Sequence, residues 1–189
     1  AIEPEIKDLT SFLKIGGANI KWVGKRTLRI EGVKTLKSIN YSIMNDRIEA
    51  GTFCVAACLN EGNLKIKNFD PKIINTELNL LKKIGAKIQV NNHTIEVKGP
   101  KKIKSLDILK TGEYPRFPTD MQAQFMVLLA KANGKSVIQE NIFENRFMHV
   151  PELNQLGGKI EVEGETANIK GDSCLMGAPV EATDLRASA

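Results

Sequence analysis

A short pattern that ends in glycine recurs three times along this chain of 189 residues. In each copy an apolar segment with helical spacing runs into a glycine, and the three glycines stand 68 and 72 residues apart: Gly17, Gly85 and Gly157. A second glycine follows each of them after 14 or 15 residues: Gly32, Gly99 and Gly171. A period this long is a supersecondary module. The chain is therefore predicted to be built from copies of one module.

The content of the module can be read from the middle copy. Leu78, Leu81 and Ile84 have the spacing of one helical face, and Gly85 follows where a helix C-terminus favours a left-handed residue. Two short segments with alternating apolar residues come next, on either side of the Asn91-Asn92-His93 turn, and predict a hairpin. The complete module reads strand, helix, strand, helix, strand, strand.

The other helix of each module begins at a polar residue followed by an aspartate. The three starts are Asn45-Asp46, Thr119-Asp120 and Thr183-Asp184. Thr119 and Gln122 have the spacing of a capping box. In this register two complete modules span roughly 40–99 and 105–171, and incomplete copies flank them. The sequence predicts an α/β fold of repeated βαβαββ units, incomplete at both ends.

Charge is unevenly distributed along the chain. The formal net charge is +5, yet residues 63–110 contain eleven lysines and only four acidic residues. This segment contains no arginine and one aromatic residue, Phe69, whereas nucleic-acid surfaces usually interleave the two. The lysines are interpreted as solvent-facing, and no nucleic-acid partner is predicted.

The cysteines and the hydropathy exclude several further classes. Three widely spaced cysteines, Cys54, Cys58 and Cys174, do not form a disulfide framework. Cys54 and Cys58 are interpreted as core residues, because no further histidine or cysteine stands nearby to complete a metal site. No apolar run approaches the ~18 residues of a membrane span. These observations predict a cytoplasmic protein without a membrane segment, a metal or an organic cofactor.

Four stretches resemble the UDP-N-acetylglucosamine enolpyruvyl transferase family. They are Asp46–Phe53 (DRIEAGTF), Phe117–Phe125 (FPTDMQAQF), Arg146–Leu153 (RFMHVPEL) and Ala182–Ala189 (ATDLRASA). They occur in the family's order, and the resemblance covers essentially the whole chain. One departure is Glu181, where the family more often has an apolar residue.

The resemblance implies two lobes, each an inside-out α/β barrel of three units. Residues 1–43 would form the end of the first lobe, and 44–189 would form most of the second, with two full units and the start of a third. The family transfers the enolpyruvyl group of phosphoenolpyruvate to the 3'-hydroxyl of UDP-N-acetylglucosamine, the first committed step of peptidoglycan synthesis. The family's Lys-Asn pair and its cysteine loop would lie upstream, in the missing part of the first lobe. The isolated chain is therefore predicted to be inactive.

The resemblance also assigns site residues. Asp120 would contact the attacking sugar hydroxyl, either orienting it or removing its proton. Arg146 and Arg186 would bind anionic groups, Asp184 would hold Arg186, and Ile142 would touch the nucleotide sugar through its backbone. From residue type alone, Asp120 could equally be a first-turn carboxylate that complements the helix dipole. The two arginines could equally be members of surface ion pairs.

Two other functions are compatible with parts of the sequence. The shikimate-pathway enolpyruvyl transferase shares the repeated architecture and the donor, although the 117–125 and 146–153 stretches favour the nucleotide-sugar enzyme. A non-catalytic binding module that uses the lysine-rich segment is the alternative from another class. Preferential binding of one acceptor separates the nucleotide-sugar enzyme from the shikimate-pathway enzyme. A salt-dependent affinity for nucleic acid would identify the binding module.

Overall fold

The computed structural model describes residues 2–182 and divides the chain into two compact units, Ala1–Asp46 and Arg47–Ala189. The predicted start of the second lobe at residue 44 lies close to this division. The assignment of the two parts to separate lobes remains a prediction. Asp184 and Arg186, both predicted site residues, lie outside the described residues.

The first unit contains one helix and one hairpin. Helix α1 (Pro4–Ile15) is followed by strands β1 (Asn19–Trp22) and β2 (Leu28–Glu31), which pair antiparallel. Gly17 has a φ of +100°, and its N–H donates to the carbonyl of Lys14 at 3.0 Å. The Lys37 N–H then bonds to the carbonyl of Gly16 at 2.8 Å, which returns the chain to the end of the helix.

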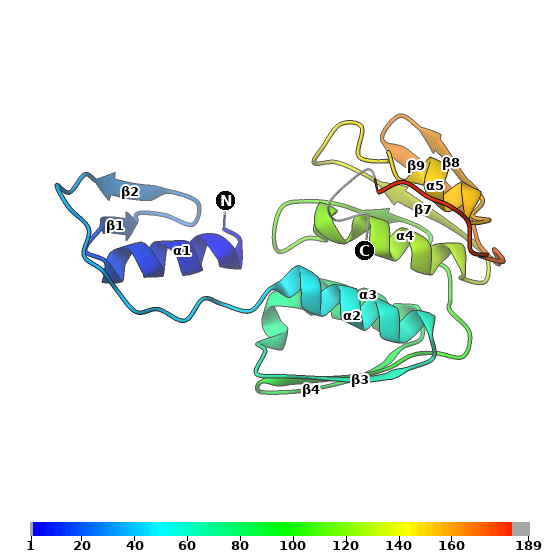
Figure 1. Ribbon diagram of the computed structural model, residues 1–189, viewed down its shortest axis with the longest axis horizontal. Coiled ribbons are helices and arrows are strands. Elements are labelled where there is room, and N and C mark those ends of the chain that lie inside the picture. Colours follow the sequence, from blue (N-terminus) through cyan, green and yellow to red (C-terminus); the bar gives the residue numbers. More distant parts are fainter. Residues whose placement is uncertain (1, 183–189) are drawn as a thin grey trace. The chain divides into compact units, whose positions relative to one another are not determined.

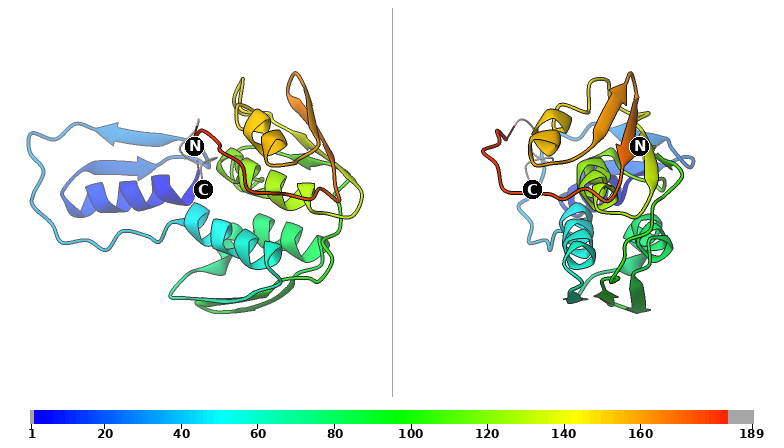
Figure 2. Two further views of the ribbon diagram at one scale, coloured as in Figure 1. Left: turned by 45° about the vertical axis from the view of Figure 1, so that its right-hand side comes forward. Right: turned by 90° about the vertical axis from the view of Figure 1, so that its right-hand side faces the viewer.

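The second unit contains two repeats, and the first repeat runs from Arg47 to Lys98. Its elements are α2 (Arg47–Leu59), β3 (Asn63–Lys67), η1 (Pro71–Ile74), α3 (Asn75–Lys83), β4 (Lys87–Asn91) and β5 (Thr94–Lys98). The sheet order is β3-β5-β4, and both pairings are antiparallel. Helices α2 and α3 pack on this sheet (Figure 2).

The second repeat runs from Leu109 to Lys170. Its elements are β6 (Leu109–Lys110), η2 (Thr119–Met121), α4 (Gln122–Ala130), β7 (Lys135–Gln139), α5 (Val150–Gln155), β8 (Ile160–Glu163) and β9 (Thr166–Lys170). The sheet order is β6-β7-β9-β8, with β6 parallel to β7. The last three strands have the same order as β3-β5-β4, which confirms the predicted repeat.

The first strand predicted for the 40–99 module is not formed. Residues 32–46 contain no regular element, and in the described part of the chain β3 has β5 as its one strand neighbour. The chain is irregular here because it passes from the first compact unit into the second. The prediction of two complete βαβαββ modules is therefore correct for 105–171 and wrong at the start of 40–99.

The glycines have equivalent roles in the two repeats. Gly85 and Gly157 have φ values of +111° and +100°, as the left-handed helix end requires. The N–H groups of Gly99 and Gly171 donate to the carbonyls of Gly62 and Gly134, each at 2.9 Å. A Cβ on Gly99 would lie 2.3 Å from the carbonyl oxygen of Ala57 in α2, and a Cβ on Gly171 would lie 1.9 Å from that of Ala132, just after α4. These two positions therefore require glycine for space.

Helices α2 and α4 pack against each other, so that the helices lie between the two sheets (Figure 1). This arrangement agrees with the predicted inside-out order of helices and sheets. The core includes Cys54 and Cys58, both fully buried and free, as the sequence predicts. Phe125, Leu128 and Leu129 of α4 are also fully buried.

The surface agrees with the interpretation of the charge. All eleven lysines of the 63–110 segment are exposed. None of the helices within residues 2–182 combines the length and apolar character that a bilayer span requires.

Candidate functional site

Asp120 lies in η2, at the start of the helical segment that continues into α4. The approach to it is fixed by Phe117, which is 2% exposed and packs edge-on against Phe125 with ring centroids 4.8 Å apart. The backbone of Phe117 is also held, because its carbonyl accepts from the Gly112 N–H at 2.9 Å. The aspartate therefore stands on an anchored turn.

Arg146 reaches Asp120 from a different segment, the loop between β7 and α5. Its Nη2 lies 3.1 Å from Oδ1 of Asp120, and the two side chains are 22% and 39% exposed. Its guanidinium lies over the ring of Phe143, 5.7 Å from the centroid. Two residues that were predicted separately as site residues are thus brought together in a pair that solvent can reach.

Thr119 does not cap the helix, so the capping-box prediction is wrong. Neither η2 nor α4 has a side-chain cap, and Gln122 is 1% exposed. The Thr119 hydroxyl instead donates to Oε2 of Glu140 at 2.9 Å. A tertiary partner has taken the place of the local one, because a hydrogen bond to a carboxylate is stronger than one between neutral groups.

Glu140 is the central acceptor of the site. It follows β7 directly, and it is 1% exposed. Its Oε1 accepts from the Thr111 hydroxyl at 2.8 Å, the Ile142 N–H at 2.9 Å and the Phe143 N–H at 3.3 Å. Together with Thr119, these bonds connect the end of β6, the start of η2 and the loop after β7.

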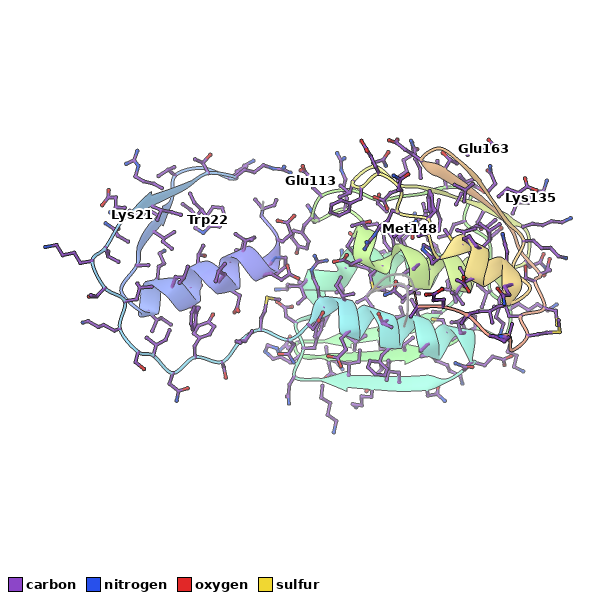
Figure 3. All side chains as sticks on the ribbon, turned by 45° about the horizontal axis from the view of Figure 1, so that its top comes forward. Lys21, Trp22, Glu113, Lys135, Met148 and Glu163 are labelled. Carbon is purple, nitrogen blue, oxygen red and sulfur yellow. The ribbon has the colours of Figure 1, made fainter. Side chains whose placement is uncertain are left out.

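The loop after β7 is held by a second set of bonds. The Asn141 N–H donates to the Thr111 hydroxyl oxygen at 2.8 Å, and its side-chain amide donates to the Thr111 carbonyl at 3.1 Å. Ile142, predicted to touch the nucleotide sugar, is 37% exposed. Figure 3 labels Met148 in this loop and Glu113 in the loop before η2.

Sequence reasoning did not identify Glu140, Thr111 or Thr119 as parts of the site. The available signal is weak: Glu140 is an acidic residue directly after β7, at the end of a strand that the repeat predicts. Nothing in the sequence around this glutamate indicates that its side chain is buried. No group of three histidine, cysteine or acidic side chains is placed to hold a metal within residues 2–182.

The profile of the family described as EPSP synthase (3-phosphoshikimate 1-carboxyvinyltransferase) matches residues 1–189. The UDP-N-acetylglucosamine 1-carboxyvinyltransferase of Pelagibacter ubique is 61% identical over 188 residues, and that of Geotalea daltonii is 52% identical over 189 residues. Both matches include the whole of this chain but only 45% of the relative, so the chain spans less than half the length of these curated proteins.

Solved structures give the same fold. The enolpyruvyl transferase NikO from Streptomyces tendae matches with a TM-score of 0.80 and 26% identity, over 98% of this chain and 45% of that protein. The EPSP synthase from Acinetobacter baumannii matches with a TM-score of 0.59 and 18% identity, over 86% of this chain and 39% of that protein. The second likeness concerns the fold alone.

Proposed function

Because the chain belongs to the EPSP synthase (3-phosphoshikimate 1-carboxyvinyltransferase) family, we propose that it forms the acceptor side of an enolpyruvyl transferase active site. The acceptor is the 3'-hydroxyl of UDP-N-acetylglucosamine, and the donor is phosphoenolpyruvate. The observation that carries the proposal is the half-exposed Asp120, fixed 3.1 Å from Arg146 by two segments that resemble the same family. The identities of 61% and 52% to UDP-N-acetylglucosamine 1-carboxyvinyltransferases support this acceptor.

Asp120 is the proposed catalytic residue. Its Oδ1 is paired with Arg146, and no residue in the described part bonds Oδ2, which can accept the hydrogen of the sugar hydroxyl. The carboxylate then either orients that hydroxyl or takes its proton as the oxygen attacks the enolpyruvyl carbon. Arg146 holds the carboxylate in place, and its guanidinium is the kind of group that binds an anionic substrate group.

Ile142 is the proposed backbone contact to the nucleotide sugar. Its N–H donates to Glu140, so its carbonyl is the group available to a substrate donor. Arg186 and Asp184 complete the proposed set, with Arg186 binding an anionic group and Asp184 holding it. The two residues stay predictions from the sequence.

The remaining groups are proposed to come from the rest of a longer enzyme. Residues 1–43 would be the end of its first lobe, and 44–189 would be most of the second. A single lobe cannot close over phosphoenolpyruvate or exclude water from it. The 189-residue chain alone is therefore proposed to be inactive, and the complete enzyme to serve the first committed step of peptidoglycan synthesis in the cytoplasm.

The shikimate-type reaction is the second candidate, because the matching family carries the name of the shikimate enzyme. The acceptors differ in ways that a site can discriminate: one is a nucleotide sugar and the other is a phosphorylated cyclic acid. The chain is 61% identical to the Pelagibacter ubique UDP-N-acetylglucosamine 1-carboxyvinyltransferase but 18% identical to the EPSP synthase from Acinetobacter baumannii. This difference supports the nucleotide sugar as the acceptor. The exposed lysines without arginine favour neither reaction and do not support nucleic-acid binding.

The experiment uses a full-length chimera, in which this chain replaces the matching segment of the Pelagibacter ubique enzyme. Phosphate release is measured with phosphoenolpyruvate and either UDP-N-acetylglucosamine or shikimate 3-phosphate. With phosphoenolpyruvate present, we expect turnover of about 1 s⁻¹ or more when UDP-N-acetylglucosamine is the acceptor, and none when shikimate 3-phosphate is the acceptor. A folded chimera that is inactive with UDP-N-acetylglucosamine, or that prefers shikimate 3-phosphate, contradicts the proposal. The isolated 189-residue chain, assayed in parallel, is expected to release no phosphate.

A further inference from the structure

We propose that Glu140 is a positioning residue, whose buried carboxylate holds Asp120 and the 141–146 loop in a fixed relation. The inference rests on the proposed function and assigns the residue that assembles its site. Glu140 does not touch substrate. It acts on Asp120 through Thr119, and on Ile142 and Arg146 through the loop.

Three separate segments meet at the Glu140 carboxylate. Thr111 follows β6 directly, Thr119 begins η2, and Ile142 lies two residues beyond Glu140 itself. The corresponding distances to the carboxylate oxygens are 2.8, 2.9 and 2.9 Å. Asp120 is the next residue after Thr119, and Arg146 is four residues after Ile142. The two halves of the Asp120–Arg146 pair are thus each attached to the same group.

The chemistry of the partners requires an acceptor at this position. All four groups bonded to Glu140 are donors: two hydroxyls and two backbone N–H groups. Within residues 2–182 no cation forms an ion pair with this carboxylate. At 1% exposure, water cannot replace a lost partner, so the four bonds are made together and each is costly to break.

The first repeat indicates that the fold itself does not need this carboxylate. After β3, the Phe69 N–H bonds to the carbonyl of His93 in the neighbouring hairpin turn at 3.2 Å. After β7, the Glu140 N–H bonds to the carbonyl of Glu165 in the equivalent turn at 2.9 Å. Phe69 is 2% exposed, so the same place in the architecture is filled by an apolar side chain. The glutamate in the second repeat therefore serves the site rather than the sheet.

Three substitutions in the full-length chimera separate positioning from packing. Thr119→Val removes the donor to Oε2 and keeps the side-chain shape, and it is expected to lower kcat about 10-fold. Glu140→Ala is expected to lower kcat about 100-fold or more, because displaced reacting groups lose that much. Glu140→Gln keeps an accepting oxygen for three donors, and its amide can donate to Thr119. It should therefore retain kcat to within about fivefold, a change of about 1 kcal/mol.

The control is Ser136→Ala in β7. Ser136 is also a buried hydroxyl that holds a backbone group, since its Oγ accepts from the Leu106 N–H at 3.0 Å. Its loss should lower the melting temperature without changing kcat. The KM for UDP-N-acetylglucosamine should change less than about threefold in Thr119→Val, since uniform substrate binding is retained.

A double-mutant cycle tests whether Glu140 acts through Asp120. In an Asp120→Asn background, Thr119→Val should change kcat less than about twofold, because the group it positions has already been removed. Equal effects in both backgrounds overturn the inference, as does a Thr119→Val enzyme with normal kcat. Loss of activity in the unsubstituted chimera would contradict the proposed function instead.

A readout without activity completes the test. Crystal structures of the chimera and of its Thr119→Val variant give the Asp120–Arg146 distance directly. The inference expects the pair to separate beyond about 4 Å, the limit of an ion pair. An unchanged pair at 3.1 Å overturns it.

Discussion

Each repeat of the second unit pairs an arginine with a carboxylate, and the two pairs differ in exposure. In the first repeat, Arg47 and Glu77 lie 3.9 Å apart with side chains 8% and 4% exposed. In the second, Arg146 and Asp120 lie 3.1 Å apart with side chains 22% and 39% exposed. One pair is part of the core, and the other can be reached by solvent. Burial, rather than residue type, separates the pair interpreted as structural from the pair that we propose to be functional.

The buried pair belongs to the packing of the first repeat. Arg47 also lies over the ring of Tyr114, 5.6 Å from its centroid. Burial raises the pKa of Glu77, and the charge of Arg47 partly offsets that rise. The cost of desolvating both groups leaves such a pair little net stabilisation, although losing one partner is strongly unfavourable.

The connections after the equivalent strands also differ. In the first repeat seven residues, 68–74, which include η1, lead from β3 to α3. In the second, ten residues, from Glu140 to His149, lead from β7 to α5. The longer connection carries Ile142 and Arg146, and Glu140 holds it to the sheet. We propose that this longer, anchored loop gives the second repeat the site that the first repeat lacks.

The largest expected effect is that of Asp120→Asn in the chimera. Turnover should fall about 10³-fold, because the acceptor of the sugar hydroxyl proton is lost. The control in the first repeat is Asp70→Asn, at another aspartate, which precedes the 3-10 turn η1 and caps it by accepting from the Lys72 N–H at 3.0 Å. It should leave kcat unchanged. Steady-state phosphate release compares the two, and similar losses would remove the functional distinction between the repeats.

The two arginines should separate stability from activity. Arg47→Met leaves Glu77 buried without its partner and should cost about 3 kcal/mol of unfolding free energy. Arg146→Met should cost less than about 1 kcal/mol of stability, because its pair is partly exposed. It should nevertheless lower kcat/KM about 100-fold, since Asp120 loses its orientation. Denaturant unfolding and kinetics on both variants test this, and the reverse pattern would contradict the assignment.

The closing glycines should behave alike in both repeats. Gly99→Ala and Gly171→Ala each place a Cβ against a backbone carbonyl oxygen and should each cost about 2 kcal/mol or more. Gly32→Ala, at the corresponding position of the first unit, is the control, because a Cβ there meets nothing within 4 Å. A neutral effect at either repeat position would show that the two repeats do not close in the same way.

The smallest effect concerns the cysteines of α2. Burial is the first cause that raises the pKa of Cys54 to about 12 and the pKa of Cys58 to about 11. A raised pKa in the folded state favours folding as long as the thiols stay protonated. Below their ordinary pKa near 9 both thiols are protonated in the folded and unfolded states, so this contribution to stability is fully present. It declines as the pH rises toward 11 to 12. At pH 8, iodoacetamide should modify the exposed Cys174 alone, as mass spectrometry can check. Rapid labelling of Cys54 under native conditions would contradict the buried helix.

The repeats were predictable from the sequence because their signals are local. A glycine at φ near +100° and apolar residues at helical spacing are encoded within about ten residues. The hairpins and the order of elements follow from the same signals. The Asp120 and Arg146 positions depended on resemblance, since neither residue type identifies a site. Asp184 and Arg186 remain predictions of that kind.

What the sequence could not predict depends on distant partners. Thr119 has the spacing of a local cap, yet it bonds to Glu140, 21 residues away. Thr111 meets the same carboxylate from 29 residues away. Likewise, nothing in the local sequence of residues 40–46 indicates that the predicted strand is not formed there. In each case the tertiary environment, rather than the local propensity, decides the structure.

The most direct measurement is a crystal structure of the chimera with UDP-N-acetylglucosamine bound. We expect the sugar 3'-hydroxyl oxygen at about 2.6–3.2 Å from Oδ2 of Asp120, the range of a productive hydrogen bond. We also expect the Ile142 carbonyl in contact with the nucleotide sugar, and Arg47 and Glu77 still paired and away from it. A nucleotide sugar bound with its 3'-hydroxyl beyond hydrogen-bond reach of Asp120, or held by the first repeat instead, would contradict the account.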